Sequence, residues 1–145
     1  MGNRAVITIK KDGVLNNFDK NEIGVYLHWN GGYDSVSAFL KYCELKEYIS
    51  PEKDYNSWTK LRNVIENYFE GESNVVIDKC ENLYCNNFDN GVYLIKDWKI
   101  VGRVYYDDEE QDSYDMLEML LYINEKQPKE EQLTEDFINM NFKEN

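Results

Sequence analysis

The chain has 145 residues and a mass of 17.3 kDa, the size of one ordinary domain with a single hydrophobic core. Apolar residues make up 42% and charged residues 30%, which favours a folded domain over a disordered segment. Sixteen basic and 28 acidic residues give a formal charge of -12, which argues against direct binding to a nucleic-acid backbone as the main activity.

Membrane insertion and secretion are also not indicated. The sequence has no apolar run of roughly 18 residues, so we expect no transmembrane helix. The first ten residues, MGNRAVITIK, do not place a charged segment before an apolar one, so we expect no secretion signal. The three cysteines, Cys43, Cys80 and Cys85, are irregularly spaced, and reduced thiols in a cytosol fit them better than a disulfide framework.

Catalytic motifs are missing from the sequence. His28 is the only histidine, so it would have to serve any Ser–His or Cys–His pair as base, or join two cysteines and a carboxylate around zinc. The sequence has no Walker-type loop, no GxSxG and no HExxH. We therefore expect no enzymatic activity, no metal and no cofactor.

The first half of the chain predicts two strands and two helices. Alternating β-branched residues predict a strand over 4–10, and a second strand is predicted over 23–30. In the second strand one face, predicted to be core, carries Ile23, Val25, Leu27 and Trp29, and the other carries Gly24, Tyr26, His28 and Asn30. A helix follows to about residue 48, with Asp34 or Ser35 as N-cap, and a second helix is predicted over 55–70.

The second half predicts short strands and then helices. Strands are predicted over 74–78, 83–84, 91–96 and 100–106, the last two as a hairpin, and helices over 113–126 and 134–142. Grouped helices and hairpin connections favour α+β over a doubly wound fold. We therefore predict one α+β domain over residues 1–145, with a mostly antiparallel sheet and helices packed on one face.

Charge is concentrated in the C-terminal helical part, residues 107–145. Those residues include 13 acidic and 3 basic side chains, a net charge of -10, and they begin with the run Asp107–Asp112. One interpretation is a solvated surface that keeps the protein dispersed. The other is a surface that imitates a phosphate backbone toward a nucleic-acid-binding partner.

The segment 26–36, YLHWNGGYDSV, is the one motif with chemical content. Glycine lets backbone approach a ligand closely, and a helix N-terminus offers unpaired N–H groups and partial positive charge. Rings stack on bases and amides bond to phosphate or ribose, so the segment predicts a nucleotide site. Its predicted ligand-binding residues are Tyr26, His28, Trp29, Asn30, Gly31, Gly32 and Tyr33. The alternative is a tight strand-to-helix turn with Trp29 in the core and Asp34 as cap.

Three residues elsewhere are added to the predicted site. Arg4 and Arg103 could balance an anionic ligand, or pair with surface carboxylates. Trp98 lies at the predicted hairpin tip. If its ring is exposed there, it indicates a contact with a ligand or partner; the alternative is a ring folded back over the sheet.

Several stretches resemble a small family of phage and prophage proteins from low-G+C Gram-positive bacteria. They are GNRAVI at 2–7, GVYLHWNGG at 24–32, DSV at 34–36, FLKYC at 39–43, DNG at 89–91 and KDWKIVGR at 96–103. Where the family often has arginine after the double glycine, this chain has Tyr33, which weakens an anion-binding role there. The resemblance implies a setting: small cytosolic phage proteins without catalytic motifs are often antagonists of bacterial immunity.

Two functions follow as expectations, and the alternative to both is a phage housekeeping or assembly factor with neither activity. The first is a phage-encoded counter-defence protein that acts in the host cytoplasm and sequesters a small anionic nucleotide immune signal without catalysis. The signal is expected to bind between protomers of a homo-oligomer. The second is an acidic, anti-CRISPR-like inhibitor that binds a host protein of a nucleic-acid-processing defence complex. Neither needs nucleic acid or a membrane as partner.

Overall fold

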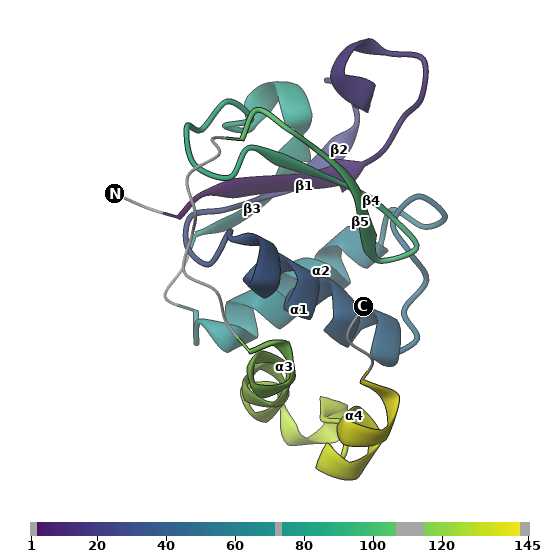
Figure 1. Ribbon diagram of the computed structural model, residues 1–145, viewed down its shortest axis with the longest axis vertical. Coiled ribbons are helices and arrows are strands. Elements are labelled where there is room, and N and C mark those ends of the chain that lie inside the picture. Colours follow the sequence, from purple (N-terminus) through teal and green to yellow (C-terminus); the bar gives the residue numbers. More distant parts are fainter. Residues whose placement is uncertain (1–2, 72–73, 107–114, 143–145) are drawn as a thin grey trace.

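The computed structural model describes residues 3–71, 74–106 and 115–142, which form one five-stranded sheet with four α-helices on one side (Figure 1). The strands are β1 (Ala5–Ile9), β2 (Ile23–Leu27), β3 (Val75–Lys79), β4 (Val92–Lys96) and β5 (Lys99–Val104). They lie in the order β3-β2-β1-β4-β5. β1 and β4 are parallel and the other neighbouring pairs antiparallel, so the predicted α+β domain with a mostly antiparallel sheet is confirmed.

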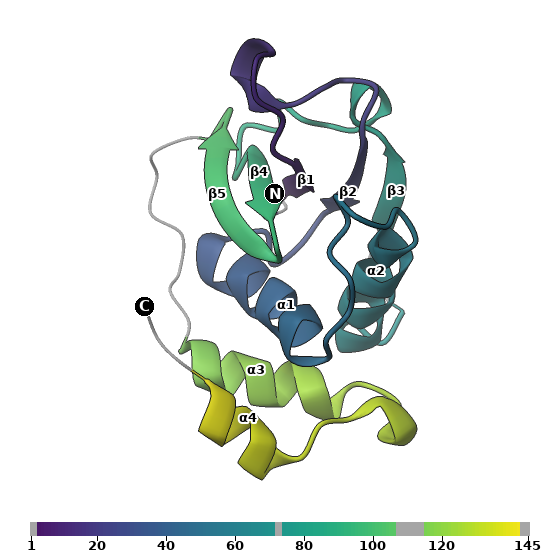
Figure 2. The ribbon, with the colours of Figure 1, turned by 90° about the vertical axis from the view of Figure 1, so that its right-hand side faces the viewer.

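The helices form two layers beneath the sheet (Figure 2). α1 (Tyr33–Leu45) and α2 (Ser57–Tyr68) lie next to it, and α3 (Met116–Glu125) and α4 (Glu135–Asn141) lie beyond them. Because α1 contacts both β5 and α3, its buried residues are spread around much of its circumference. They include Val36, Phe39, Leu40, Tyr42 and Cys43.

The main core lies between the sheet and the helices. Alternate strand residues point to opposite faces, so Ile7, Val25 and Leu27 meet the helices and are fully buried. The opposite face carries a smaller core in which Val6 and Leu94 are covered by Phe18 and Cys80 from the connecting segments. Both faces are therefore covered over much of their area, although helices cover only one.

The outer helical layer is held by buried polar bonds as well as apolar contacts. The Tyr42 hydroxyl donates to Asn124 Oδ1 at 2.8 Å, and the Asn124 amide donates to the Leu133 carbonyl at 2.7 Å. Gln127 donates to the Val64 carbonyl of α2 at 3.1 Å. Removing one partner of such a bond leaves a buried polar group unsatisfied, so these bonds fix the position of α3 on α1 and α2.

Four local predictions are wrong. The predicted strand over 23–30 ends at Leu27, because Asn30 has a left-handed φ of 56° that turns the chain toward α1. Trp29 therefore lies beyond the alternating pattern and is 45% exposed instead of in the core. Residues 83–84 form no strand, since the Leu83 N–H closes a turn on the Cys80 carbonyl. The N-cap of α1 is Gly32, not Asp34 or Ser35.

The helical predictions hold elsewhere, with the bounds given above. The predicted helix start at residues 113–114 and the acidic run 107–112 lie outside the described residues. In the part of the chain that is described, no helix combines the length and apolar character needed to cross a membrane.

Candidate functional site

The double-glycine turn is closed by the chain itself. The Gly31 N–H donates to the Asn3 carbonyl at 2.8 Å, and the Gly31 carbonyl accepts from the Tyr93 hydroxyl at 2.7 Å. A Cβ at Gly31 would lie 2.5 Å from the Asn3 oxygen, which is too close for any real side chain. Gly31 and Gly32 are both buried. Glycine is required at position 31 by the approach of the N-terminal backbone, and the turn presents no open cradle for a ligand.

The sheet separates the other predicted residues. Arg4, Tyr26, His28 and Trp29 lie near one another, and Tyr26 packs against the smaller core on the face opposite the helices. The Tyr26 hydroxyl lies 2.9 Å from His28 Nδ1, and the rings of His28 and Trp29 meet edge to face at 5.0 Å. This group is a surface cluster of rings, and four of the ten predicted ligand-binding residues belong to it.

Arg4 in this cluster already has a counter-charge. Its Nε lies 2.8 Å from Asp89 Oδ2, its backbone N–H donates to the same oxygen at 3.1 Å, and its guanidinium lies 5.4 Å from the Tyr84 ring. Burial raises the pKa of Asp89, but the bonds to Arg4 outweigh it and hold that pKa below its usual range. Arg4 is therefore largely neutralised and contributes little to attracting an anion.

Arg103 lies on the helical side of the sheet. Its guanidinium is held between the rings of Tyr93 and Tyr106, at 4.5 and 4.4 Å from their centroids. It donates to the backbone and side-chain oxygens of Asn90, both at 3.1 Å. Tyr93 brings Arg103 near the start of α1, where the Tyr33 ring centroid is 6.4 Å from that of Tyr93.

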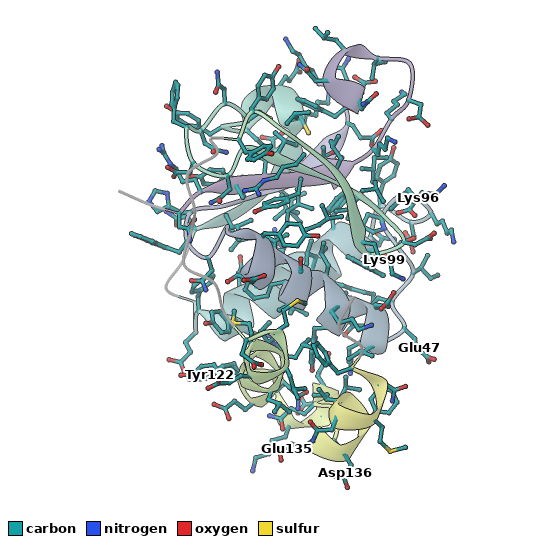
Figure 3. All side chains as sticks on the ribbon, viewed as in Figure 1. Glu47, Lys96, Lys99, Tyr122, Glu135 and Asp136 are labelled. Atoms are coloured by element: carbon teal, nitrogen blue, oxygen red, sulfur yellow. The ribbon has the colours of Figure 1, made fainter. Side chains whose placement is uncertain are left out.

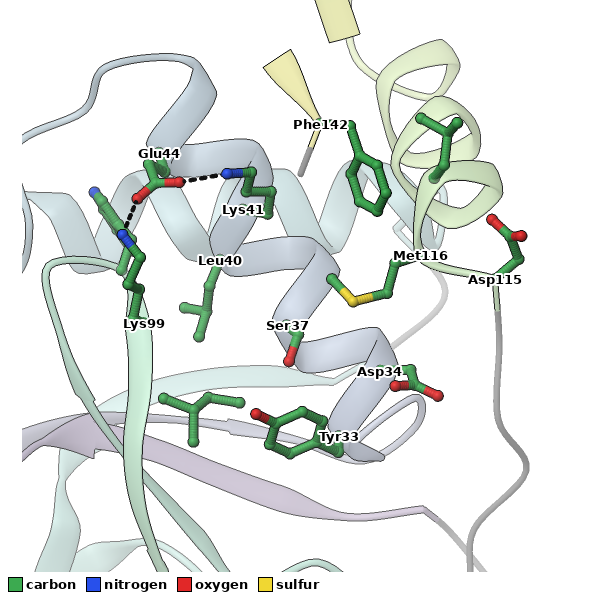
Figure 4. Close-up of a pocket in the computed structure, with 13 residues that line it drawn as sticks. Tyr33, Asp34, Ser37, Leu40, Lys41, Glu44, Lys99, Asp115, Met116 and Phe142 are labelled. Atoms are coloured by element: carbon green, nitrogen blue, oxygen red, sulfur yellow. Dashed lines mark hydrogen bonds and ion pairs between the residues drawn. The ribbon is translucent and has the colours of Figure 1, made fainter. Parts of the chain in front are cut away.

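A groove of about 620 Å³ runs along α1 from this point (Figure 4). Side chains of α1 form one wall, the β4–β5 hairpin and β5 a second, and the first turn of α3 with Phe142 the third. Two predicted site residues line it, Tyr33 and Trp98. Glu44, at the other end, lies eleven positions after Tyr33 along the helix, a length of roughly 16 Å.

Three charged side chains meet at the far end of the groove. Glu44 accepts from Lys41 at 2.8 Å through one carboxylate oxygen and from Lys99 at 3.0 Å through the other (Figure 4). Burial raises the pKa of Glu44, but the two ammonium groups more than offset this and keep that pKa below its usual value. Two cations share one carboxylate, so this end carries an excess positive charge.

The near end of the groove has the opposite character. The Tyr33 ring is 51% exposed, its neighbour Asp34 also lines the groove, and Asp115 lines the groove from the start of α3 (Figure 4). Asp115 also accepts from the Glu118 N–H at 2.9 Å and caps α3. The groove thus joins an exposed ring and hydrogen-bond acceptors at one end to lysines at the other.

Trp98 is buried and not an exposed contact residue. Its ring is 5% exposed, and its Nε1–H donates to the Tyr48 carbonyl at 2.8 Å. Asp97 and Trp98 both have left-handed φ angles, 51° and 63°, so the two-residue turn folds the ring back toward α1. Of the two interpretations of this residue, the ring folded over the sheet is the one observed.

Lys41, Glu44 and Lys99 were not predicted as site residues. The spacing of Lys41 and Glu44 on a predicted helix indicates an ion pair, but Lys99 comes from 55 residues further along the chain. Among the described residues, no group of three or more histidine, cysteine or acidic side chains is arranged to hold a metal ion.

The chain was compared with protein-family models, curated proteins and solved structures. No family model matches the chain, and no curated protein or solved structure matches it either.

Proposed function

We propose that this chain is a binding protein that takes a small anionic nucleotide-type ligand into the α1 groove. The observation that carries this proposal is the groove itself. Its volume of about 620 Å³ falls in the range of roughly 300–1,000 Å³ that is usual for small-molecule sites. Its two ends differ in the same way as the two ends of a nucleotide.

The ring end suits a base. Tyr33 offers half of its surface for stacking, and the Asp34 and Asp115 carboxylates can accept hydrogen bonds from amino and ring N–H groups. The lysine end suits a phosphate, because Lys41 and Lys99 donate charge-assisted hydrogen bonds. This excess of positive charge is local, since the whole chain has a formal charge of -12.

The biological role that we propose is counter-defence by sequestration. The resemblance to phage proteins supports this setting, in which the protein acts in the host cytoplasm and withholds a nucleotide immune signal from its effector. Binding without turnover is sufficient for that role. Arg4 and Arg103, which the sequence suggests as counter-charges, both have partners within the protein, and Lys41 and Lys99 supply the positive charge instead.

Thermal melting against a panel of nucleotides tests the proposal. The panel holds nucleoside monophosphates, cyclic mono-, di- and trinucleotides, ADP-ribose and NAD. A ligand at a hundredfold excess over Kd stabilises the native state by about 2.7 kcal/mol, which raises the midpoint by several degrees in a chain of this size.

Two tryptophan variants locate the site. Ser37→Trp fills the groove and should abolish the shift, whereas Thr59→Trp adds the same bulk on the exposed side of α2 and should leave it intact. A thermal shift that persists in Ser37→Trp would show that the ligand binds at another site. No shift with any compound in the unmodified protein would overturn the proposal.

A second function is favoured by the outer helical layer. Residues 115–142 include seven acidic and two basic side chains, and Glu135 and Asp136 point outward from α4 (Figure 3). Met140 is 81% and Phe137 39% exposed on the same helix. Acidic groups around apolar anchors suit a basic protein partner, which is the inhibitor expected from the sequence.

This second function has its own test. Capture of a host protein should weaken steeply with salt, and it should be lost when Glu135 and Asp136 become Gln and Asn together with Met140→Ser. The same variants should leave nucleotide shifts in the α1 groove unchanged. Capture that persists in the triple variant, and in a variant with residues 107–112 neutralised, would exclude the acidic surface as the contact.

A further inference from the structure

The lysine end of the groove is occupied by one of the protein's own carboxylates. Glu44 bridges Lys41, on the same helix, and Lys99, at the start of β5, with 2.8 and 3.0 Å contacts. The side chains of Lys41 and Glu44 are 23% and 29% exposed, and that of Lys99 is 62% exposed. An incoming anion therefore meets two ammonium groups that already have a partner.

We propose that Glu44 determines the specificity of this groove, and that it selects a nucleotide with a terminal phosphate monoester over a phosphate diester or a nucleoside. This inference rests on the proposed function and names the class of ligand that the site takes. Glu44 holds the position of the phosphate until a more highly charged group displaces it.

Charge balance at the three residues gives the selection. Lys41 and Lys99 contribute two positive charges and Glu44 one negative charge. A diester carries one negative charge, so it replaces the carboxylate without neutralising more of the lysine charge. A monoester carries about -1.5 to -2 at neutral pH and three acceptor oxygens, so it can neutralise both ammonium groups. A nucleoside has no group with which to displace Glu44.

The Glu44 side chain can leave the lysines without a change in the backbone. Glu44 is in the last turn of α1 and is partly exposed, so a rotamer change carries its carboxylate into water without moving the backbone. The cost of separating it from Lys99 is small, because the Lys99 side chain is 62% exposed and solvent weakens an ion pair at such a position. Discrimination between ligands therefore comes from the charge on the phosphate and not from the cost of displacing Glu44.

Calorimetric titration of matched ligands tests the inference. The probes are the nucleoside, the 5′-monophosphate and the 3′,5′-cyclic monophosphate of adenine and of guanine. The unmodified protein should bind one 5′-monophosphate at least about tenfold more tightly than its cyclic form, the difference expected for one additional charge-assisted contact.

Charge variants then identify the group responsible. Glu44→Gln should increase the affinity for both phosphates and reduce the preference for the monoester, because the competing anion is gone. Lys41→Gln and Lys99→Gln should each weaken the monoester about tenfold or more. Lys96→Gln, an exposed residue of the same hairpin outside the groove, is the control and should change nothing.

The outcomes distinguish a failure of this inference from a failure of the proposed nucleotide-binding function. If nucleotides bind and Ser37→Trp blocks them, but monoester and diester bind alike and Glu44→Gln has no effect, the inference is wrong and the proposed function stands. If neither the unmodified protein nor Glu44→Gln binds any of these probes, the inference is wrong, and the proposed function falls with it only if the wider nucleotide panel also gives no thermal shift. Because Lys99 is mostly exposed, its variant is expected to fold and keeps the test decisive even if Glu44→Gln is unstable.

Discussion

The hydroxyl of Tyr93 donates a 2.7 Å hydrogen bond to the carbonyl oxygen of Gly31, which ties the interior strand β4 to the turn that starts α1. Tyr93 is fully buried, and burial raises the pKa of its hydroxyl above the usual value, so it stays a neutral donor at all ordinary pH. The same ring lies against Arg103 and near Tyr33. The bond therefore sets the position of the groove's ring end relative to the sheet.

Tyr93→Phe should destabilise the fold by about 1–3 kcal/mol, because it leaves the buried Gly31 carbonyl without this donor. Urea unfolding gives the measurement. Tyr33→Phe removes a hydroxyl from a half-exposed ring and serves as the control, with an expected change within about 0.5 kcal/mol. Equal effects of the two variants would show that the Tyr93–Gly31 bond does not anchor the turn.

Gly31→Ala should lower the stability of the fold more than the same substitution at a glycine with free space around it. The added Cβ would lie 2.5 Å from the Asn3 oxygen and 2.8 Å from the Ala5 Cβ, so the N-terminal backbone must shift, at a cost of about 1–3 kcal/mol or more. Gly71→Ala is the comparison, since nothing lies within 4 Å there and only its φ of 78° opposes a side chain. A smaller loss at position 31 than at 71 would contradict the close approach.

The glycine turn shows where sequence reasoning succeeded and where it stopped. The sequence predicts that the glycines let backbone N–H groups approach a ligand closely. In the structure the Gly31 N–H donates instead to the carbonyl of Asn3, 28 residues away. Strands and helices could be predicted because their apolar periodicity is local. The ion pair between Lys99 and Glu44 could not be predicted, since it depends on how the β4–β5 hairpin packs against α1. Trp98 was ambiguous for the same reason, because its direction is set by the left-handed turn.

Asp89→Asn should lower the free energy of unfolding at neutral pH, and it should make that free energy depend less on pH in the acid range. The pKa of Asp89 in the folded protein lies below the unfolded value of about 4, so its ion pair with Arg4 stabilises the fold above that pH. This contribution is lost as the pH falls through the lower, folded-state pKa. At pH 7 the variant should lose about 1–3 kcal/mol, since the Arg4 side chain is then left mostly buried without its partner.

Unfolding curves from pH 7 down to about 2 measure this difference. Asp12→Asn is the control, because Asp12 is 88% exposed and lies 3.5 Å from Lys10, a pair expected to contribute little. The gap between Asp89→Asn and the unmodified protein should close toward the acid end of the series. A gap that stays constant with pH would show that the Asp89 carboxylate does not titrate with the shifted pKa.

The two tryptophans Trp98 and Trp29 should differ sharply in their effect on folding. Trp98→Ala removes a ring that is 5% exposed and packs in the main core, and a loss of about 3–5 kcal/mol is expected. Trp29→Ala removes a ring that is 45% exposed and touches His28 at its edge, so the loss should stay within about 1 kcal/mol. Trp98→Phe isolates the bond to the Tyr48 carbonyl and should cost about 1–3 kcal/mol. Similar losses for the two alanine variants would contradict the placement of Trp98 beneath the groove, and with it the wall that the hairpin provides.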